Sequence, residues 1–250
     1  MEILSIHAHP DDAEILAGGT LALLARLGHN VTIVTMTAGD CGSAEHSAEA
    51  IAAIRKAEAT AAGAVIGACY RWAGFGDLNV FNDDLSRRQV CSLIREIRPQ
   101  LVLTASPIDY HCDHEATSIL VRDACFAASV PNYKVPGTAG HLDQIPHLYY
   151  MDSIEGQDRD GNALTPDFFV NITAVFERKR EMLACHESQR AWLRKQHGID
   201  DYLAQMERWT RARGRLCDVE FAEGFRRYQG HPYPQTPLLE ELLDSHVAQK

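Results

Sequence analysis

The chain has 250 residues, of which 46% are hydrophobic, and its formal net charge is −10 at pH 7. A chain of this length and composition can bury a sizeable core, and one α/β domain over residues 1–250 is expected. The negative net charge argues against nucleic acid or an anionic membrane as a general partner. The seven cysteines form no C-x-x-C pair, the first residues do not resemble a signal peptide, and no apolar run could span a bilayer. A cytoplasmic location is therefore expected.

The first half of the chain alternates between strand and helix patterns. Strands are predicted at residues 3–8, 31–36, 70–73 and 101–105, and helices at residues 20–27, 47–62, 85–97 and from His114 to about Ser129. This alternation predicts a Rossmann-like, doubly wound and mostly parallel sheet flanked by helices. In such a sheet, ligands bind beyond the carboxyl ends of the strands.

The second half of the chain gives weaker patterns. A loop with proline and glycine is predicted at residues 131–140, and two strands at residues 147–151 and 168–172. The polar turn at residues 158–162 is interpreted as the turn of a hairpin between these strands. From Thr173 to Gly230 the chain is expected to be mostly helical, with an extended tail after it.

Two clusters of chemically capable residues follow predicted strands. His9, Asp11 and Asp12 come after the first strand, and the run from His111 to His114 comes after the strand at residues 101–105. Two imidazoles and one carboxylate are a ligand set typical of catalytic zinc, and iron(II) can use the same ligands. His9, Asp12 and His114 are therefore the candidate metal ligands, which leaves one coordination position open for water.

The remaining residues of the two clusters suggest how such a site would work. Asp11 is the candidate general base, because a carboxylate beside a metal can take a proton from the attacking water. A protonated His111 could face the oxyanion, and Asp113 is the natural acceptor for one of the histidine rings. The sequence does not indicate which ring Asp113 serves.

These motifs resemble those of a known family. The run from Ala8 to Glu14, Gly18-Gly19-Thr20-Leu21 and His111-Cys112-Asp113-His114 are similar to the motifs of the PIG-L/LmbE-like zinc-dependent N-deacetylases. Stretches that begin at Arg55, His186 and Ala222 also resemble the family, so the resemblance covers nearly the whole chain.

The resemblance implies a role for each matching residue. His9, Asp12 and His114 would bind one zinc ion, Asp11 would be the base, and His111 would stabilise the tetrahedral intermediate with help from Asp113. Arg55 would hold a substrate hydroxyl or acid group. Asp40 and Tyr110 lie in loops that depart from the family pattern and are the further candidates for substrate contact. Relatives form trimers or hexamers, so a homo-oligomer is expected.

The function expected from the resemblance is removal of an N-acetyl group from an amino sugar or an N-acetylglucosaminyl conjugate. A second hypothesis is an amidase that acts on a larger thiol-sugar or natural-product conjugate. A third is a non-catalytic binding protein with a structural zinc ion. The third hypothesis is disfavoured, because structural zinc sites are usually closed by four protein ligands and only three can be named here.

Overall fold

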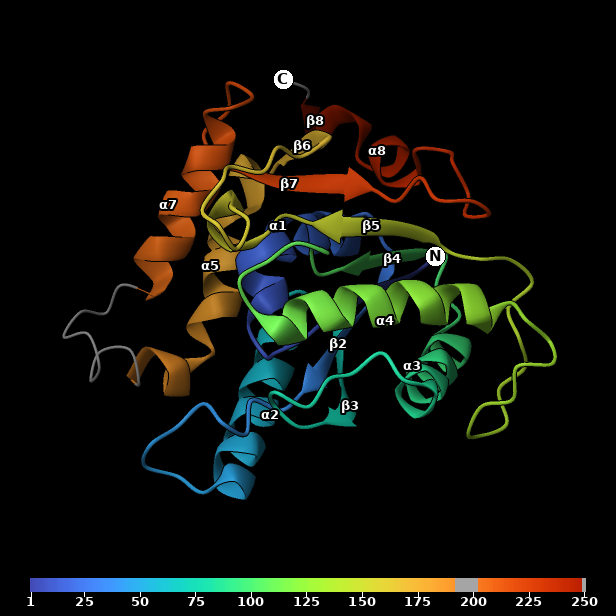
Figure 1. Cartoon of the computed structure of the whole chain (residues 1–250). Helices are drawn as coiled ribbons and strands as arrows, with labels where there is room; N and C mark the ends of the chain where they lie inside the picture. The colour runs from blue at the N-terminus through green and yellow to red at the C-terminus, as the bar shows by residue number, and fades with distance from the viewer. Residues whose placement is uncertain (192–201, 249–250) are drawn as a thin grey trace.

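The computed structural model describes residues 1–191 and 202–248 (Figure 1). Its eight strands form one sheet in the order β3-β2-β1-β4-β5-β7-β6-β8. The strands are β1 (Glu2–His7), β2 (Asn30–Thr37), β3 (Cys69–Phe75), β4 (Leu101–Thr104), β5 (His147–Met151), β6 (Phe168–Asn171), β7 (Ala222–Arg227) and β8 (Val247–Ala248). The helices are α1 (Asp12–Arg26), α2 (Ala48–Ala64), α3 (Asp84–Ile97), α4 (Cys112–Ala128), α5 (Phe176–Ala184), α7 (Tyr202–Gly214) and α8 (Leu238–Leu242).

The first five strands of the sheet are parallel and confirm the predicted doubly wound arrangement. β1 lies at the centre, with β2 on one side and β4 on the other. The strand order therefore reverses between β1 and β4, and the carboxyl ends of these two strands border one crevice. The loops that carry the two predicted clusters both leave the sheet at this point.

Helices cover both faces of the sheet, and each face has its own hydrophobic core. One core joins the sheet to α1, α5 and α7 and includes Leu21, Met182 and Met206. The other joins it to α3 and α4, which pack against each other in front of the sheet in Figure 1, and includes Val90 and Leu120. Because β1 and β4 are buried on both sides, their sequences read as nearly continuous apolar runs, whereas the edge strand β3 is partly exposed.

The predicted hairpin in the second half of the chain is wrong. A tight turn does form at residues 158–162, where the Asp158 side chain accepts hydrogen bonds from the backbone of Asp160 and Asn162. However, β5 and β6 do not pair with each other, because β7 lies between them and is antiparallel to both.

The stretch after Thr173 is less helical than expected, since β7 was missed. A buried ion pair explains the misleading polarity of this strand. Lys179 Nζ of α5 lies 2.6 Å from Glu223 Oε1 of β7, and both side chains are almost completely buried. Glu223 also accepts hydrogen bonds from the backbone of Gly19 and Thr20, so it ties α1, α5 and the sheet together. Residues 192–201 of this predicted helical stretch lie outside the described residues.

Helix α1 starts at Asp12, eight residues before the predicted helix start at Thr20. The two glycines that weakened the helical pattern lie inside the helix and allow close packing. A Cβ atom on Gly19 would lie only 2.6 Å from Ile172 Cδ1, and one on Gly18 would lie 3.2 Å from Lys179 Cγ. These glycines therefore let α1 approach its neighbours, rather than cradle a phosphate. Among the described residues, no helix is both long and apolar enough to cross a membrane.

Candidate metal centre

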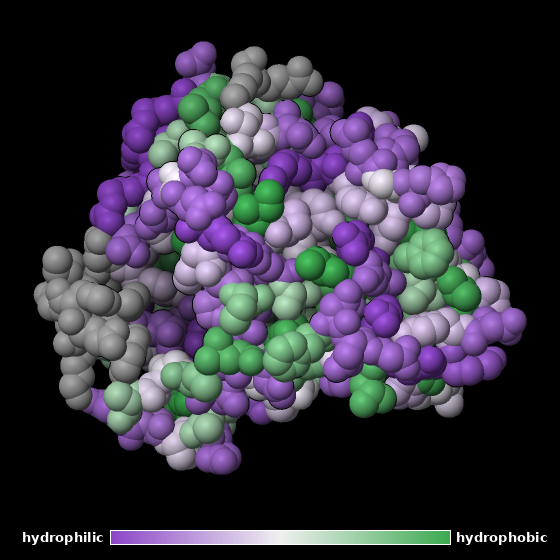
Figure 2. Space-filling view, viewed as in Figure 1, coloured by the Kyte–Doolittle hydropathy of each residue, from purple (hydrophilic) through white to green (hydrophobic). Residues whose placement is uncertain are grey.

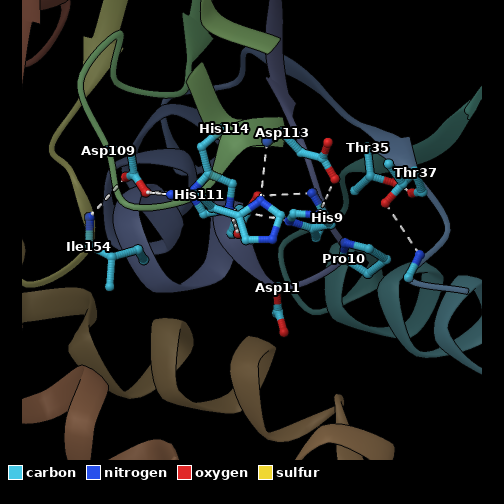
Figure 3. A network of polar contacts seen from close by, with 12 residues as sticks. His9, Pro10, Asp11, Thr35, Thr37, Asp109, His111, Asp113, His114 and Ile154 are labelled. Atoms are coloured by element: carbon cyan, nitrogen blue, oxygen red, sulfur yellow. Dashed lines mark hydrogen bonds and ion pairs between the residues drawn. The ribbon is translucent and has the colours of Figure 1, made fainter. Parts of the chain in front are cut away.

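The three histidines of the two clusters lie together at the crevice between β1 and β4 (Figure 3). His9 follows β1, while His111 and His114 lie at the start of α4. His9 Nδ1 is 3.2 Å from His114 Nε2, and the centroid of the His111 ring is 4.7 Å from that of His9 and 5.1 Å from that of His114. Ligand atoms of all three residues lie within 4.8 Å of one another.

Asp12 closes the group from the first turn of α1. Its Oδ1 lies 3.4 Å from His114 Nε2, and its Oδ2 lies 3.7 Å from His9 Nδ1. Oδ2 also accepts a 2.9 Å hydrogen bond from the backbone N–H of His9, which fixes the carboxylate beside the rings. The structure therefore brings the three predicted ligands, His9, Asp12 and His114, into mutual contact.

The outer nitrogens of the two ligand rings are held by carboxylates. His9 Nε2 lies 3.1 Å from Asp113 Oδ2, and His114 Nδ1 lies 2.9 Å from Asp109 Oδ1. A ring nitrogen that faces a carboxylate carries the proton, so in the neutral imidazoles His9 Nδ1 and His114 Nε2 present lone pairs. These lone pairs face each other and the Asp12 carboxylate, and a bound cation would satisfy all three acceptors at once. The donor set therefore fits a metal ion.

The pKa shifts of Asp12 and His114 have their cause in the same close grouping of carboxylates and imidazoles. Burial alone would raise the pKa of the Asp12 carboxyl, but His114 and His9 outweigh burial and hold this pKa below its ordinary value. Burial alone would lower the pKa of His114, but Asp12 and Asp109 raise it well above the ordinary value. Without a metal, the site thus attracts a proton to the His114 ring, and a metal ion would compete with this proton.

Asp113 serves the ring of His9 and not that of His111. Its carboxylate points from the first turn of α4 to His9 Nε2, and it also accepts a 2.8 Å hydrogen bond from the backbone N–H of Leu78. Its help to His111 comes from the backbone, since the N–H of Asp113 donates to His111 Nδ1 at 3.2 Å. The sequence left open which ring the Asp113 carboxylate serves, and in the structure this ring is that of His9.

His111 is also better described as a neutral ring than as the protonated one expected from the sequence. Burial, with His9 and His114 nearby, lowers the pKa of His111. The ring occupies the N-cap position of α4, where the helix dipole disfavours a positive charge. Because Nδ1 accepts a hydrogen bond, the neutral ring carries its proton on Nε2, which is then free to donate.

Asp11 is held in an unusual position between the metal cluster and the C-terminal helices. Its φ is 107°, in the left-handed region that non-glycine residues rarely adopt, and strain of this kind concentrates at functional sites. Asp11 Oδ2 accepts a 2.5 Å hydrogen bond from the hydroxyl of Tyr202 in α7 and a 3.2 Å hydrogen bond from Arg55. In Figure 3 its carboxylate extends away from the histidine rings, toward these helices.

Two opposing effects act on the pKa of Asp11. Burial raises this pKa, whereas the Arg55 guanidinium and the Tyr202 hydroxyl lower it, and the balance is a raised pKa. A raised carboxyl pKa favours proton acceptance. The role of Asp11 as a base stays a prediction.

Arg55 is committed to partners within the protein. Its side chain is buried and donates to the backbone oxygen of Pro10 at 2.6 Å as well as to Asp11. The loop above it passes so close that a Cβ atom on Gly39, whose φ is +70°, would lie 2.3 Å from the guanidinium. Arg55 lines the pocket, but its hydrogen bonds hold the Asp11 loop, and contact with a substrate stays a prediction.

An open pocket of about 410 Å³ lies over the cluster, within the size range of small-molecule sites. Tyr110 lines it and packs edge-on against His111 and His114, with ring centroids 5.7 and 5.6 Å away. Asp40 is not among the described residues that line the pocket; its carboxylate accepts a 2.7 Å hydrogen bond from the backbone N–H of Asp77 and so supports the pocket wall. The other lining residues include Cys41, Asp77, Leu78, Ile154, Gln189, Gln205 and Trp209.

Sequence reasoning missed two residues of this site. Asp109 orients His114, and its position five residues before a ligand histidine was the signal that could have identified it. Tyr202 lies 191 residues from Asp11 along the chain, and nothing in its local sequence marks it. Cys112, the unusual residue of the second motif, is exposed and is not among the described pocket residues.

Known proteins are similar to this chain in sequence and in fold. The model of the PIG-L family, described as GlcNAc-PI de-N-acetylase, matches residues 4–125. A probable N-acetyl-alpha-D-glucosaminyl L-malate deacetylase from Bacillus cereus is 30% identical over 196 residues, which cover 75% of this chain and 83% of the relative. A diacetylchitobiose deacetylase from Thermococcus kodakarensis is 29% identical over 198 residues, covering 75% and 70%.

One relative has a different activity in its name. A 4-oxalmesaconate hydratase from Pseudomonas putida is 27% identical over 194 residues, which cover 74% of this chain and 73% of the relative. Among solved structures, the 4-carboxy-2-hydroxymuconate hydratase of Pseudomonas putida superimposes with a TM-score of 0.75 at 23% identity, covering 94% of this chain and 99% of the other. The likeness of these structures is a likeness of fold.

Proposed function

The chain belongs to the PIG-L/LmbE-like deacetylase family, and from this premise we propose that it is a zinc-dependent hydrolase. The reaction proposed is removal of the N-acetyl group from an amino sugar or an N-acetylglucosaminyl conjugate. One observation carries the proposal: two imidazole lone pairs and the Asp12 carboxylate converge on one point, and a second carboxylate, Asp11, lines the same pocket. The deacetylases among the relatives are named for N-acetylated sugars and conjugates, which supports the substrate class.

His9, Asp12 and His114 would hold the metal ion. When bound, the ion supplies a Lewis acid that polarises the attacking water and the amide carbonyl. Asp11 then takes the proton of the water as it attacks the carbonyl carbon, while Arg55 and Tyr202 keep the carboxylate in place. His111 donates from Nε2 to the developing oxyanion, and protonated Asp11 returns its proton to the leaving amine.

The pocket above these residues is open to solvent and can accept the remainder of a conjugate. The alternative of an amidase for a larger thiol-sugar or natural-product conjugate uses the same chemistry and differs only in substrate size. Zinc rather than iron(II), a cytoplasmic location and a trimeric or hexameric assembly stay predictions from the sequence.

A second candidate function is hydration of an unsaturated acid, which the hydratase relative favours. A base and a Lewis acid can also promote the addition of water to a conjugated double bond. The two functions make different demands on the pocket, because an unsaturated polyacid needs cationic partners. The permanently charged cation among the described lining residues is Arg55, which is already paired with Asp11. This favours the deacetylase.

One experiment separates the two candidates. The zinc-loaded protein is incubated with N-acetylglucosamine, N,N′-diacetylchitobiose and larger N-acetylglucosaminyl conjugates, and released acetate is measured. In parallel, loss of the ultraviolet absorbance of an unsaturated dicarboxylic acid reports hydration. Acetate release without hydration is the expected result. Hydration without acetate release would replace the proposed function with the second candidate.

A further inference from the structure

The pocket over the metal centre has an apolar, fixed side chain at its mouth. Leu78 lies in the loop between β3 and α3 and lines the pocket, yet 61% of it is exposed. In Figure 2 hydrophobic residues gather on the surface over this loop, where Phe81 and Leu85 are also exposed. An exposed leucine at a pocket mouth is available for contact with a ligand.

The backbone of Leu78 is not free to turn this side chain away. Its φ is 60°, in the left-handed region that is costly for a residue with a branched side chain. The conformation is held by the 2.8 Å hydrogen bond from the Leu78 N–H to Asp113 Oδ2, the carboxylate that also holds His9. The position of Leu78 is thereby tied to the metal ligands themselves.

The neighbouring wall of the pocket is acidic. Asp77 also lines the pocket, and its Oδ2 accepts a 2.8 Å hydrogen bond from the backbone N–H of Cys41. Its Oδ1 is buried and has no hydrogen-bond partner among the described residues. Because no described residue donates a hydrogen bond to this oxygen, the negative charge of the Asp77 carboxylate is only partly offset, and it repels a carboxylate on a ligand. Arg55, the permanently charged cation of the described lining, is nearly buried and paired, so it leaves this wall negative.

From this combination we propose that the pocket mouth at Asp77, Leu78 and Tyr110 binds an uncharged, partly apolar group attached to the sugar and discriminates against an anionic group. The substrate class is then a neutral N-acetylglucosaminide whose second part carries an aromatic or aliphatic surface. Leu78 supplies apolar contact, Tyr110 offers an exposed ring face, and Asp77 supplies the charge that excludes acids. The inference rests on the proposed function for its site and its sugar.

Three glycosides that share one aryl ring test the proposal. They are the phenyl, 4-carbamoylphenyl and 4-carboxyphenyl N-acetyl-β-D-glucosaminides, in which the carbamoyl group matches the size of the carboxylate without its charge. For the zinc-loaded protein we expect kcat/KM to be highest for the phenyl glycoside and at least about tenfold lower for the carboxyphenyl glycoside. Equal values for all three, or the highest value for the carboxyphenyl glycoside, would overturn the inference.

Two variants assign the effect to residues. Leu78→Asn removes the apolar side chain but preserves the loop, because asparagine tolerates the left-handed backbone and its N–H can still donate to Asp113. We expect this variant to lower kcat/KM for the phenyl glycoside about tenfold relative to N-acetylglucosamine. Asp77→Asn removes only the charge and should raise the ratio of carboxyphenyl to carbamoylphenyl turnover about three- to tenfold. Leu85→Asn is the matched control, since Leu85 is 79% exposed but does not line the pocket, and it should leave both ratios unchanged.

A binding measurement distinguishes failure of this inference from failure of the proposed function. Calorimetry with the phenyl and 4-carboxyphenyl glycosides and the zinc-loaded Asp11→Asn variant, which keeps the metal ligands but lacks the base, reports the same discrimination without turnover. If no glycoside is deacetylated but the phenyl glycoside binds more tightly, the proposed function fails and the pocket selectivity stands. If all are deacetylated at equal rates with equal affinities, the proposed function stands and this inference fails.

Discussion

Replacing Tyr202 by Phe removes one hydroxyl from the site and tests how Asp11 is positioned. The Tyr202 hydroxyl donates to Asp11 Oδ2 at 2.5 Å, and after the substitution Arg55 is the remaining donor to that oxygen among the described residues. A hydrogen bond to a charged group contributes about 1.5–3 kcal/mol, so loss of its full effect in the transition state would lower kcat about 10- to 150-fold. The lower end is expected, because Arg55 still holds the carboxylate.

The pH dependence of the same variant gives a second readout. The Tyr202 hydrogen bond lowers the pKa of Asp11, against the larger effect of burial, which raises it. Without the hydroxyl this pKa should rise further, and since a base must be ionised, activity should be lost at a higher pH as the solution is acidified. The acid limb of the kcat profile therefore moves upward in Tyr202→Phe, with zinc content and KM nearly unchanged.

Tyr149→Phe provides the control for this experiment. Tyr149 is also buried, and its hydroxyl also donates to a carboxylate oxygen, Glu240 Oε2, at 2.5 Å, but it does not line the pocket. It should show a comparable loss of thermal stability with an unmoved acid limb and kcat. Wild-type kcat and an unmoved acid limb in Tyr202→Phe would refute the positioning role, as would equal kinetic effects in both variants.

Three further predictions concern the residues around the metal. His111→Ala should keep stoichiometric zinc and lower kcat by about 10² or more, the scale for loss of one oxyanion donor; loss of zinc as well, measured by metal analysis after dialysis, would make His111 a ligand. Asp109→Asn should weaken zinc affinity about 10- to 100-fold in chelator competition, because Asp109 Oδ1 holds the His114 ring, and an unchanged affinity would refute this role. His186 lies 3.4 Å from Glu14, which outweighs burial and raises its pKa above 6.5. Its stabilising contribution is then complete below about pH 6.5 and is lost as the pH rises through the folded-state pKa, so the difference in unfolding free energy between wild type and His186→Gln should shrink with rising pH; a difference that grows would contradict the sign.

The parallel half of the fold and the metal ligands could be predicted from local patterns. Each of β1 to β4 is followed by a helix, β1 and β4 are apolar runs, and the doubly wound rule places the ends of these two strands at one crevice. His9 and His114 needed only that rule to meet, although they are 105 residues apart.

The remaining features depend on contacts that no local pattern encodes. β7 reads as polar because it carries Glu223, and only the fold reveals that this charge is buried against Lys179. Tyr202 is an ordinary apolar position of a helix until α7 packs over the site and its hydroxyl reaches Asp11. Which histidine ring the Asp113 carboxylate contacts depends on the direction of the first turn of α4, and the spacing of the motif leaves this direction open.

The most direct test of the account compares acetate release by wild type and Asp11→Asn, both loaded with zinc to the same measured content, on the best N-acetylglucosaminyl substrate. We expect turnover by wild type and a loss of several orders of magnitude in the variant, because the variant keeps the ligands His9, Asp12 and His114 but lacks the base. Equal turnover at equal zinc content would contradict the assignment of Asp11 and the mechanism built on it.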